Sequence, residues 1–459
     1  MDERTAAIIE ELRAENKRLK TELGRMNERI ESLERENRQL REQLEKAQGA
    51  ALRQAGPFRR DERGKVPPEQ QKPPGRKSGH PGSYRQEPMQ IDETVEVRLD
   101  TCPKCGGAVT DCRRLEQVIE EIPSLKPRVV RVITYSGRCQ RCGEVRSRHP
   151  LQTSVSQGAA KVQLGPRALA LAVCLNKVHG LTMRKTCACL RDLVGLRITA
   201  GGLSQAIARV AGRVKGLYEK LLEDIRAAPA VFADETSWWV GGPGWWLWAF
   251  TEPKTTVYRV DSSRGSIVVK DVLTDQFKGM LVSDCLSSYD PCDYAKHKCI
   301  AHHLRAIAKA MDLPGTQDKQ YLSEWKTFFE AVILLYKIRN VLGEDDFADK
   351  RNRMEIWCDR LLARLDNQPG DASVKNRLSK QRKHLLGCLY EPHAEPTNNR
   401  AERALRPAVI ARKLSCGNKT RRGRDCWQIL ASIGATCRQR MVDFVDYLAP
   451  QLPLTTQPG

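Results

Sequence analysis

Three acidic residues stand where metal-binding carboxylates would be expected. Asp234 follows the apolar run AVFA, Asp284 follows GMLVS, and Glu402 lies within PTNNRAERALRP. A carboxylate that ends a buried strand is costly unless it is paired or bound to a cation, and such oxygen ligands suit Mg²⁺. Two such acids with a third from a helix would hold two ions about 3.5–4 Å apart, which activate a water or a 3′-hydroxyl and stabilise the leaving oxygen. The pattern therefore predicts a catalytic carboxylate site.

Each acid also has a simpler interpretation. Asp234 would be an ordinary strand-end residue, and Asp284 would cap a helix that follows it. Glu402 would be a first-turn acid, favoured there by the dipole of its own helix. Spacing alone leaves the catalytic and the structural interpretations equally open.

The first two acids lie in a stretch whose pattern changes from helical to extended. Alternation and turn residues predict strands at 229–240, 244–253 and 255–263, a helix at 266–277 and a strand at 278–290. This order is the opening of a ribonuclease-H-like α/β domain. We assign residues 228–450 to that catalytic core, with mostly helix after Lys296 and a helical insertion at about 300–390.

The charge of the chain indicates the kind of partner. The 459 residues include 77 Lys and Arg against 56 Asp and Glu, a net charge of +21, which favours a polyanion and most simply nucleic acid. The basic residues nearest Glu402 are expected to contact DNA phosphates, although a solvated charged face would have the same composition. They are Arg400, Arg403, Arg406, Arg412 and Lys413.

No feature of the sequence predicts a membrane protein. No apolar run approaches the ~20 residues of a spanning helix, and the N-terminal MDERTAAIIEEL lacks the apolar core of a signal peptide. We therefore expect a cytoplasmic protein. In that setting the 16 cysteines are expected to be thiols or metal ligands rather than disulfides.

Four of the cysteines form two CxxC pairs, each followed by glycine. Cys102 and Cys105 belong to CPKCGG, and Cys139 and Cys142 belong to CQRCG, with short strand-like segments between the pairs. Two such pairs are typical of a tetrahedral four-cysteine Zn²⁺ site of ribbon type, whereas a redox motif needs only one. We assign residues 93–150 to a zinc-binding domain.

The N-terminal part of the chain predicts an oligomer. Residues 1–48 carry apolar or Asn side chains at period seven over five heptads, which indicates a coiled coil and hence a homodimer or higher oligomer. Residues 49–92 are rich in Pro, Gly and basic residues, as in an extended linker. Residues 160–227 predict helices, with Thr182 and either Thr199 or Ser204 as N-caps. A helix-turn-helix that binds DNA and a plain helical bundle both fit them.

Five segments resemble the DDE transposases of the insertion sequence 66 family, and so does the order of the predicted parts. The segments are FADETSWW, GWWLWAF, LVSDCLSSYD, CIAHHLRA and, most specifically, PTNNRAERALRPAVIARK. The resemblance covers nearly the whole chain. It implies a multidomain α+β enzyme with a ribonuclease-H-like core, in which Asp234, Asp284 and Glu402 bind Mg²⁺ or Mn²⁺.

The resemblance also implies an activity and partners. The activity is DNA cleavage at the ends of a mobile element and strand transfer into target DNA by a two-metal mechanism. The partners are double-stranded DNA, as terminal repeats and target, and accessory proteins of the same element where these are required. A bacterial, nucleoid-associated enzyme is implied, and the alternative is a DNA-binding accessory or regulatory protein with an inactive core.

Two features depart from the family pattern or stand outside it. The family's CWAHARR-like run is CIAHHLRA here, and the basic segment after Lys413 is less typical, which puts substrate preference in doubt but leaves the acids in place. A second group of possible metal ligands is irregularly spaced, so a second zinc is the less favoured interpretation. The group consists of Cys292, His297, Cys299 and His302.

Overall fold

The computed structural model describes residues 85, 87–155, 162–312, 319–364 and 372–454, together with twelve helical positions between 17 and 37. The chain divides into two units, Met1–Ile119 and Glu120–Gly459. Most of the predicted coiled coil and linker lies outside the described residues, so both stay predictions. In the first unit the ordered feature is a bridge between Thr101 and Ala108 that closes the first CxxC turn.

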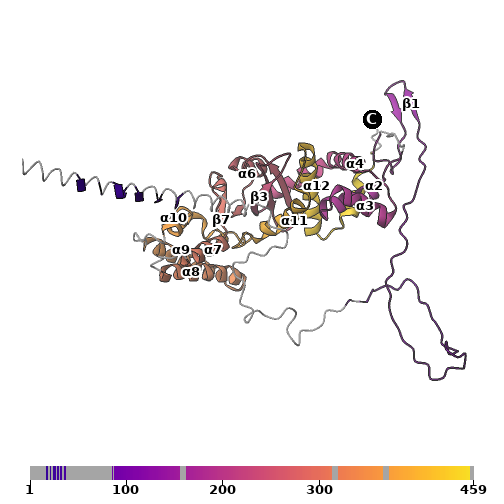
Figure 1. Cartoon of the computed structure of the whole chain (residues 1–459), viewed down its shortest axis with the longest axis horizontal. Helices are drawn as coiled ribbons and strands as arrows, with labels where there is room; N and C mark the ends of the chain where they lie inside the picture. The colour runs from indigo at the N-terminus through magenta and orange to yellow at the C-terminus, as the bar shows by residue number, and fades with distance from the viewer. Residues whose placement is uncertain are drawn as a thin grey trace, which may run out of the picture. The chain divides into compact units, whose positions relative to one another are not determined.

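The second unit contains a mixed five-stranded sheet and many helices (Figure 1). Its strands lie in the order β5-β4-β3-β6-β7; β3, β4 and β5 are antiparallel, and β6 and β7 run parallel to β3. Their bounds are Ala230–Trp238 (β3), Trp245–Thr251 (β4), Thr256–Asp261 (β5), Met280–Ser283 (β6) and Ala295–Lys298 (β7). A separate hairpin pairs β1 (Ser136–Cys139) with β2 (Gly143–Arg146).

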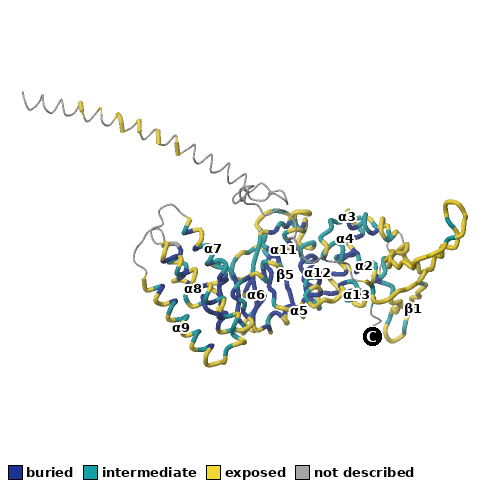
Figure 2. Tube along the Cα trace, turned by 90° about the horizontal axis from the view of Figure 1, so that it is seen from below, coloured by how far each residue is buried: buried dark blue, intermediate teal, exposed yellow. Residues whose placement is uncertain are grey.

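The sheet is the centre of the buried core, and its strands are buried between helices (Figure 2). Aromatic residues of β3 and β4 contribute much of this buried core, because Trp238 is 3% exposed and Trp248 is fully buried. Trp238 lies 4.7 Å from Trp427, between ring centroids. Core packing is therefore the main role of these two tryptophans.

The helices before the sheet begin where the sequence predicts. Thr182 and Thr199 are N-caps whose side chains accept hydrogen bonds from Lys185 N and Gly202 N. The apolar pattern that follows Thr199 predicts one long third helix, which is wrong, because two helices meet at Val214, whose ψ of 16° ends the first of them. The bounds are α2 Pro166–Val173, a π-helical turn η2 Cys174–Val178, α3 Met183–Val194, α4 Ala200–Arg213 and α5 Lys215–Ala227.

The predicted helical insertion forms a cluster of helices next to β7 with a core of its own (Figure 1). Trp325, Phe328 and Phe329 are fully buried at its centre. Its main helices are α7 Ile300–Met311, α8 Lys319–Ile338, α9 Glu344–Ala363 and α10 Ala372–Lys380. Short 3₁₀ turns complete it: η4 Arg339–Val341, η5 Arg382–His384 and η6 Gly387–Leu389.

The C-terminal helices return to the sheet, and one of them covers its open edge. Polar side chains of α12 accept hydrogen bonds from the backbone N–H groups of edge strand β5, as in the 2.8 Å bond from Tyr258 N to Ser432 Oγ. Gln428 and Thr436 make equivalent bonds, so the edge is protected from other strands. The bounds are α11 Asn399–Ser415, α12 Arg421–Gln439, α13 Phe444–Leu448 and η7 Ala449–Gln451.

Two details between the strands differ from the sequence prediction. The strand predicted at 278–290 ends at Ser283 and is followed by the 3₁₀ turn η3 Ser287–Tyr289; α6, Ser266–Leu273, precedes it as predicted. Strand β7 was not predicted, because its sequence AKHK is polar. Lys296, His297 and Lys298 are nevertheless buried.

No helix among the described residues has both the length and the apolar character needed to cross a membrane.

Close backbone approach at Gly279 provides a test of this packing. A Cβ at Gly279 would lie 2.4 Å from Ala228 O and 2.6 Å from Pro229 O, where β6 enters the sheet. We expect Gly279→Ala to lower the free energy of unfolding by about 1–3 kcal/mol. Gly212→Ala, in open space on α4, should leave it unchanged or raise it by up to about 1 kcal/mol. Urea titration of both variants measures this, and equal midpoints would contradict the packing at Gly279.

Candidate active site

The two aspartates lie at the carboxyl ends of neighbouring parallel strands. Strands β3 and β6 are in register from Ala230 opposite Met280 to Phe232 opposite Val282. Asp234 stands two residues beyond Phe232, and Asp284 is two residues beyond Val282. Because successive side chains alternate between the two faces of a sheet, Asp234 belongs to the same face as Phe232 and Val282. Asp284 lies one residue beyond the end of β6, and its charge raises the pKa of Asp234, so the two carboxylates are near each other.

Helix α11 brings Glu402 to the same face. Ala401 of α11 is buried in one cluster with Phe232 and Val282, so the first turn of the helix packs directly on β3 and β6. Glu402 is in that first turn, with its side chain 32% exposed. At the other end of the helix, Arg412 donates hydrogen bonds to Ser237 of β3, one of them 2.8 Å long to Ser237 Oγ.

The acids influence each other electrostatically. Burial is the main reason that the pKa of Asp234 rises from 3.8 to about 7, and the neighbouring carboxylates of Glu235, Asp284 and Glu402 raise it further. A second charge of the same sign is disfavoured in such a place unless a cation compensates it. The raised pKa of Asp234 thus reflects a buried carboxyl with three other acidic side chains near it.

Each carboxylate nevertheless has a protein partner of its own. Asp234 Oδ1 accepts from Glu235 N at 3.0 Å, and Asp284 Oδ1 accepts from Leu286 N at 2.9 Å. The guanidinium of Arg305 donates to Glu402 Oε1 at 3.2 Å. In keeping with this, no three His, Cys, Asp or Glu side chains in the described part of the chain are close enough together to hold a metal ion.

The neighbouring acid Glu235 has a structural role on the opposite face of the sheet. Its side chain is 2% exposed and forms an ion pair with Arg264 at 2.9 Å, and Tyr289 donates to its other oxygen at 3.0 Å. Burial raises the pKa of Glu235 even though both partners favour the charged form. This carboxylate therefore lies next to Asp234 in sequence but is already satisfied by the protein.

A buried lysine supports the end of β6. Lys298 of β7 is fully buried, and its Nζ lies 3.3 Å from Ser283 Oγ and 3.4 Å from Asp290 Oδ1. Burial lowers the pKa of Lys298, while Asp290 opposes that shift. Ser283 directly precedes Asp284, so this ion pair stabilises the segment that carries the second aspartate.

The basic residues around Glu402 fall into two groups. Arg400 is bound to Glu395 and lies over the ring of Phe232, and Arg412 is bound to β3, so both are engaged within the protein. The others point into solvent, and within the described residues none of them forms an ion pair. They are Arg403, Arg406 and Lys413, three positions along α11.

The two CxxC pairs each form a tight turn, one in each unit. Gly106 N donates to Cys102 O at 2.8 Å and the φ of Gly106 is +75°, a conformation that favours glycine. The backbone N–H of Lys104 lowers the pKa of Cys102, and that of Cys142 lowers the pKa of Cys139. Both turns thus favour the thiolate, the form that binds metal ions.

The second group of Cys and His residues is used in packing and hydrogen bonding. Cys292 belongs to the main core, and Cys299 Sγ accepts from Asn398 N at 3.1 Å. His297 is fully buried, and burial lowers its pKa to about 4, so the neutral ring lies 3.2 Å from Pro396 O. These side chains do not gather into a metal site in the described residues.

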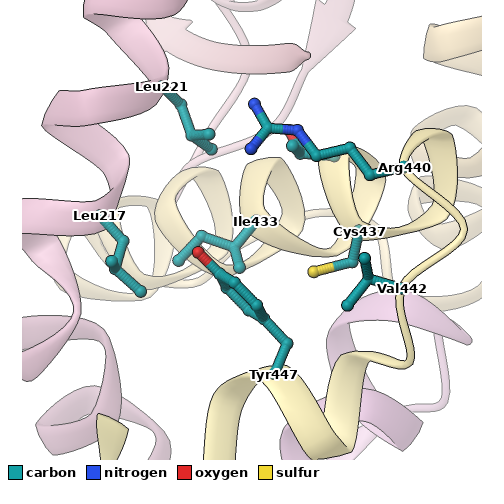
Figure 3. A pocket seen from close by; sticks show the side chains of 8 residues that line it. Leu217, Leu221, Ile433, Cys437, Arg440, Val442 and Tyr447 are labelled. Atoms are coloured by element: carbon teal, nitrogen blue, oxygen red, sulfur yellow. The ribbon is translucent and has the colours of Figure 1, made fainter. Parts of the chain in front are cut away.

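A small apolar hollow lies elsewhere in this unit, between α5, α12 and α13 (Figure 3). Arg440, the charged residue in its wall, is held by Asp224 at 2.8 Å and by Thr255. Because none of the three candidate acids lines it, the hollow is not part of the carboxylate site.

Sequence reasoning missed several residues that support the acids. Lys298 and Tyr289 gave no signal, because buried polar side chains are found only from their partners in space. Asn398 and Arg305 could have been found from the sequence. Asn398 lies four residues before Glu402, one helical turn away, and Arg305 belongs to CIAHHLRA, one of the segments that resemble the family.

Comparison with known protein families shows the class of protein to which the chain belongs. A family model described as "Transposase IS66 family" matches residues 161–425, more than half of the chain and all three acids. This match identifies a transposase, an enzyme class that cuts and moves DNA. The chain belongs to the IS66 family of transposases.

Two relatives from Sinorhizobium fredii extend the similarity beyond the matched segment. The uncharacterized protein y4qI is 24% identical over 408 residues, which cover 76% of this chain and 74% of the relative. The uncharacterized protein y4jD is 24% identical over 400 residues, covering 79% and 76%. Both are therefore similar over most of their length.

The raised pKa of Asp234 predicts how stability depends on pH without divalent cations. Between pH 3.8 and about 7 the folded state binds more protons than the unfolded state, so the free energy of unfolding falls as pH rises through this window. Asp234→Asn removes the ionisable group. In EDTA its urea midpoint should exceed that of the wild type at about pH 8, and the difference should shrink toward about pH 4.

The control for this measurement is Asp192→Asn on α3. There the neighbouring Arg191 lowers the pKa of an exposed carboxyl, so the substitution should give no gain at the higher pH. A pH-independent difference for Asp234→Asn would contradict the raised pKa.

Proposed function

We propose that Asp234, Asp284 and Glu402 are the catalytic acids of a transposase that cleaves DNA at the ends of its element and joins them to target DNA. The observation that carries this is the meeting of two strand-end aspartates and a helix glutamate on one face of the sheet. They come from positions 234, 284 and 402, and the field of the other two raises the pKa of Asp234. If the three acids were only strand-end residues and a helix-dipole acid, nothing would require them to lie on the same face of the sheet.

The order of the strands supports a ribonuclease-H-like core. Three antiparallel strands come first, and the two later strands are added in parallel beside the first of them. This connectivity brings the carboxyl ends of β3 and β6 together at one edge, where ligands commonly bind in open α/β sheets. The helical insertion follows β7, and its first helix, α7, carries Arg305, which donates to Glu402.

The donor set suits Mg²⁺ or Mn²⁺. Asp234, Asp284 and Glu402 offer hard oxygen ligands, and all three side chains are at least partly accessible. Two bound ions would supply activation of a water or 3′-hydroxyl and stabilisation of the leaving oxygen. The protein itself places the three carboxylates at one end of the sheet, and bound ions would draw them together, because among the described residues they do not form a metal-binding group by themselves.

Exposed cations on α11 are suited to orient that DNA. Arg403, Arg406 and Lys413 extend along the helix from Glu402 and are available for phosphates. Arg400 and Arg412 hold α11 in place, so their contribution to DNA binding is indirect. Phosphate contacts of this kind fix the register of a duplex without reading its sequence.

The parts before the core are proposed to recognise and pair the element ends. Helices α3 and α4, separated by the residues from Gly195 to Thr199, would act as a helix-turn-helix, and the four-cysteine Zn²⁺ unit that precedes them in the sequence would act with them. The coiled coil would join two subunits, and therefore two ends. Accessory proteins of the element would act beside this assembly.

Replacement of the glutamate tests the proposal. Glu402→Gln keeps the size of the side chain but removes its charge, so joining of a labelled terminal-repeat duplex to a plasmid in Mg²⁺ should fall by roughly 100-fold or more. Binding of the duplex in Ca²⁺ should persist. Glu330→Gln, an exposed position on α8, is the control and should retain activity.

Two results would decide against the proposal. Undiminished joining by Glu402→Gln would remove that residue from the catalytic set. A wild-type protein that binds the terminal repeats but joins nothing would favour the alternative, a DNA-binding accessory or regulatory protein with an inactive core.

The proposed zinc site has a test of its own. Purified wild-type protein should contain about one Zn²⁺ per chain, and Cys139→Ser should lose it, because a structural site needs all four thiolates. Cys112→Ser removes a cysteine outside the two pairs and should keep the metal. Elemental analysis of the purified variants measures this, and full zinc in Cys139→Ser would exclude the four-cysteine site.

A further inference from the structure

Asn398 lies where the segments that carry all three acids meet. Its side chain is fully buried, and its Nδ2 donates to Ala233 O at 2.8 Å, directly before Asp234. Its backbone carbonyl accepts from Glu402 N at 3.2 Å. One residue therefore contacts both the strand of the first acid and the backbone of the third.

The connection to the second acid passes through Cys299. Asn398 N donates to Cys299 Sγ at 3.1 Å, and Cys299 N donates to Ser283 O at 2.9 Å, directly before Asp284. Cys299 is fully buried, so neither bond competes with water. The chain just before Asn398 is anchored as well, because Ile300 N donates to Pro396 O at 2.9 Å.

The ordinary role of an asparagine at this place does not account for these contacts. Asn398 is the N-cap of α11, where the side-chain oxygen normally accepts from an N–H of the first turn. No such cap bond forms here. Oδ1 is instead buried without a partner among the described atoms, which costs stability, while Nδ2 is used on the sheet.

The end of the β3–β6 ladder explains why a donor is needed there. The two strands pair only as far as Phe232 opposite Val282. At the next residue, Ala233, the amide of Asn398 supplies a hydrogen bond to the backbone. The helix that carries Glu402 is in this way attached to β3 at the point where β6 leaves it.

We propose that Asn398, acting with Cys299, is a positioning residue that sets the spacing of Asp234, Asp284 and Glu402 for the cations. This inference rests on the proposed function of these acids. Asn398 touches no reacting atom. It acts through Ala233, Cys299 and the backbone of Glu402, and loss of its amide loosens the acids from one another without removing any of them.

The test compares two neighbouring asparagines in the full chain. Asn398→Ala removes the buried amide, whereas Asn399→Ala alters an exposed asparagine one residue later and is the matched control. The readouts are the Mn²⁺ concentration for half-maximal joining, the KM for the terminal-repeat duplex, and Mn²⁺ binding by electron paramagnetic resonance without DNA. The half-maximal Mn²⁺ concentration and the Mn²⁺ affinity do not depend on what fraction of the protein is folded.

We expect Asn398→Ala to need roughly 10- to 100-fold more Mn²⁺ and to bind it correspondingly more weakly, as residues that support metal ligands generally do. The KM for DNA should stay unchanged, and Asn399→Ala should match the wild type. If Asn398→Ala yields no folded protein by circular dichroism, Cys299→Ala takes its place in the same comparison. A folded Asn398→Ala with wild-type Mn²⁺ dependence would overturn the inference.

Different experimental results would contradict the proposed function and the inference about Asn398. Wild-type protein that binds Mn²⁺ but joins no DNA would overturn the proposed function, while the resonance titration would still decide the role of Asn398. Wild-type protein that binds no Mn²⁺ would overturn both.

Discussion

The repulsion between carboxylates held close together is the constraint on which the rest of this structure depends. Burial, followed by the charges of Glu235, Asp284 and Glu402, raises the pKa of Asp234 to about 7, so the charged form of this carboxyl is disfavoured where the fold places it. Such an arrangement persists only if surrounding interactions hold it. The ladder between β3 and β6, the attachment of α11 at both ends and the buried Lys298 are those interactions.

The same constraint explains where the other charges lie. Glu235 forms an ion pair with Arg264 on the opposite face of the sheet, yet after burial its carboxylate is the charge that raises the pKa of Asp234 most. Arg305 forms an ion pair with Glu402, and its side chain is 61% exposed. Arg403 and Arg406 stay in solvent, where a phosphate backbone reaches them. Attachment to the protein and availability to DNA are thus divided between different arginines of one helix.

Much of the fold was predictable because local patterns carry it. Alternating apolar residues predicted β3, β4 and β5, and threonines before apolar helical runs predicted the caps of α3 and α4. Strand β7 was not predictable, because its lysines and histidine are polar, and their burial depends on partners outside the strand, Asp290 for the lysines and Pro396 for the histidine. The break at Val214 also escaped prediction, since the pattern of apolar residues continues across it.

For the candidate site, the sequence by itself determined which acids to consider and the family to which they belong. It did so because strand ends, helix starts and family motifs are local features of the chain. Only the tertiary structure decided that Asp234, Asp284 and Glu402 share one face, that Glu235 does not, and that Arg400 and Arg412 are engaged within the protein. These outcomes depend on strand register and on helix packing across more than a hundred residues. The contacts of Asn398 show the difference most clearly, because its amide bonds to a strand residue 165 positions earlier in the chain.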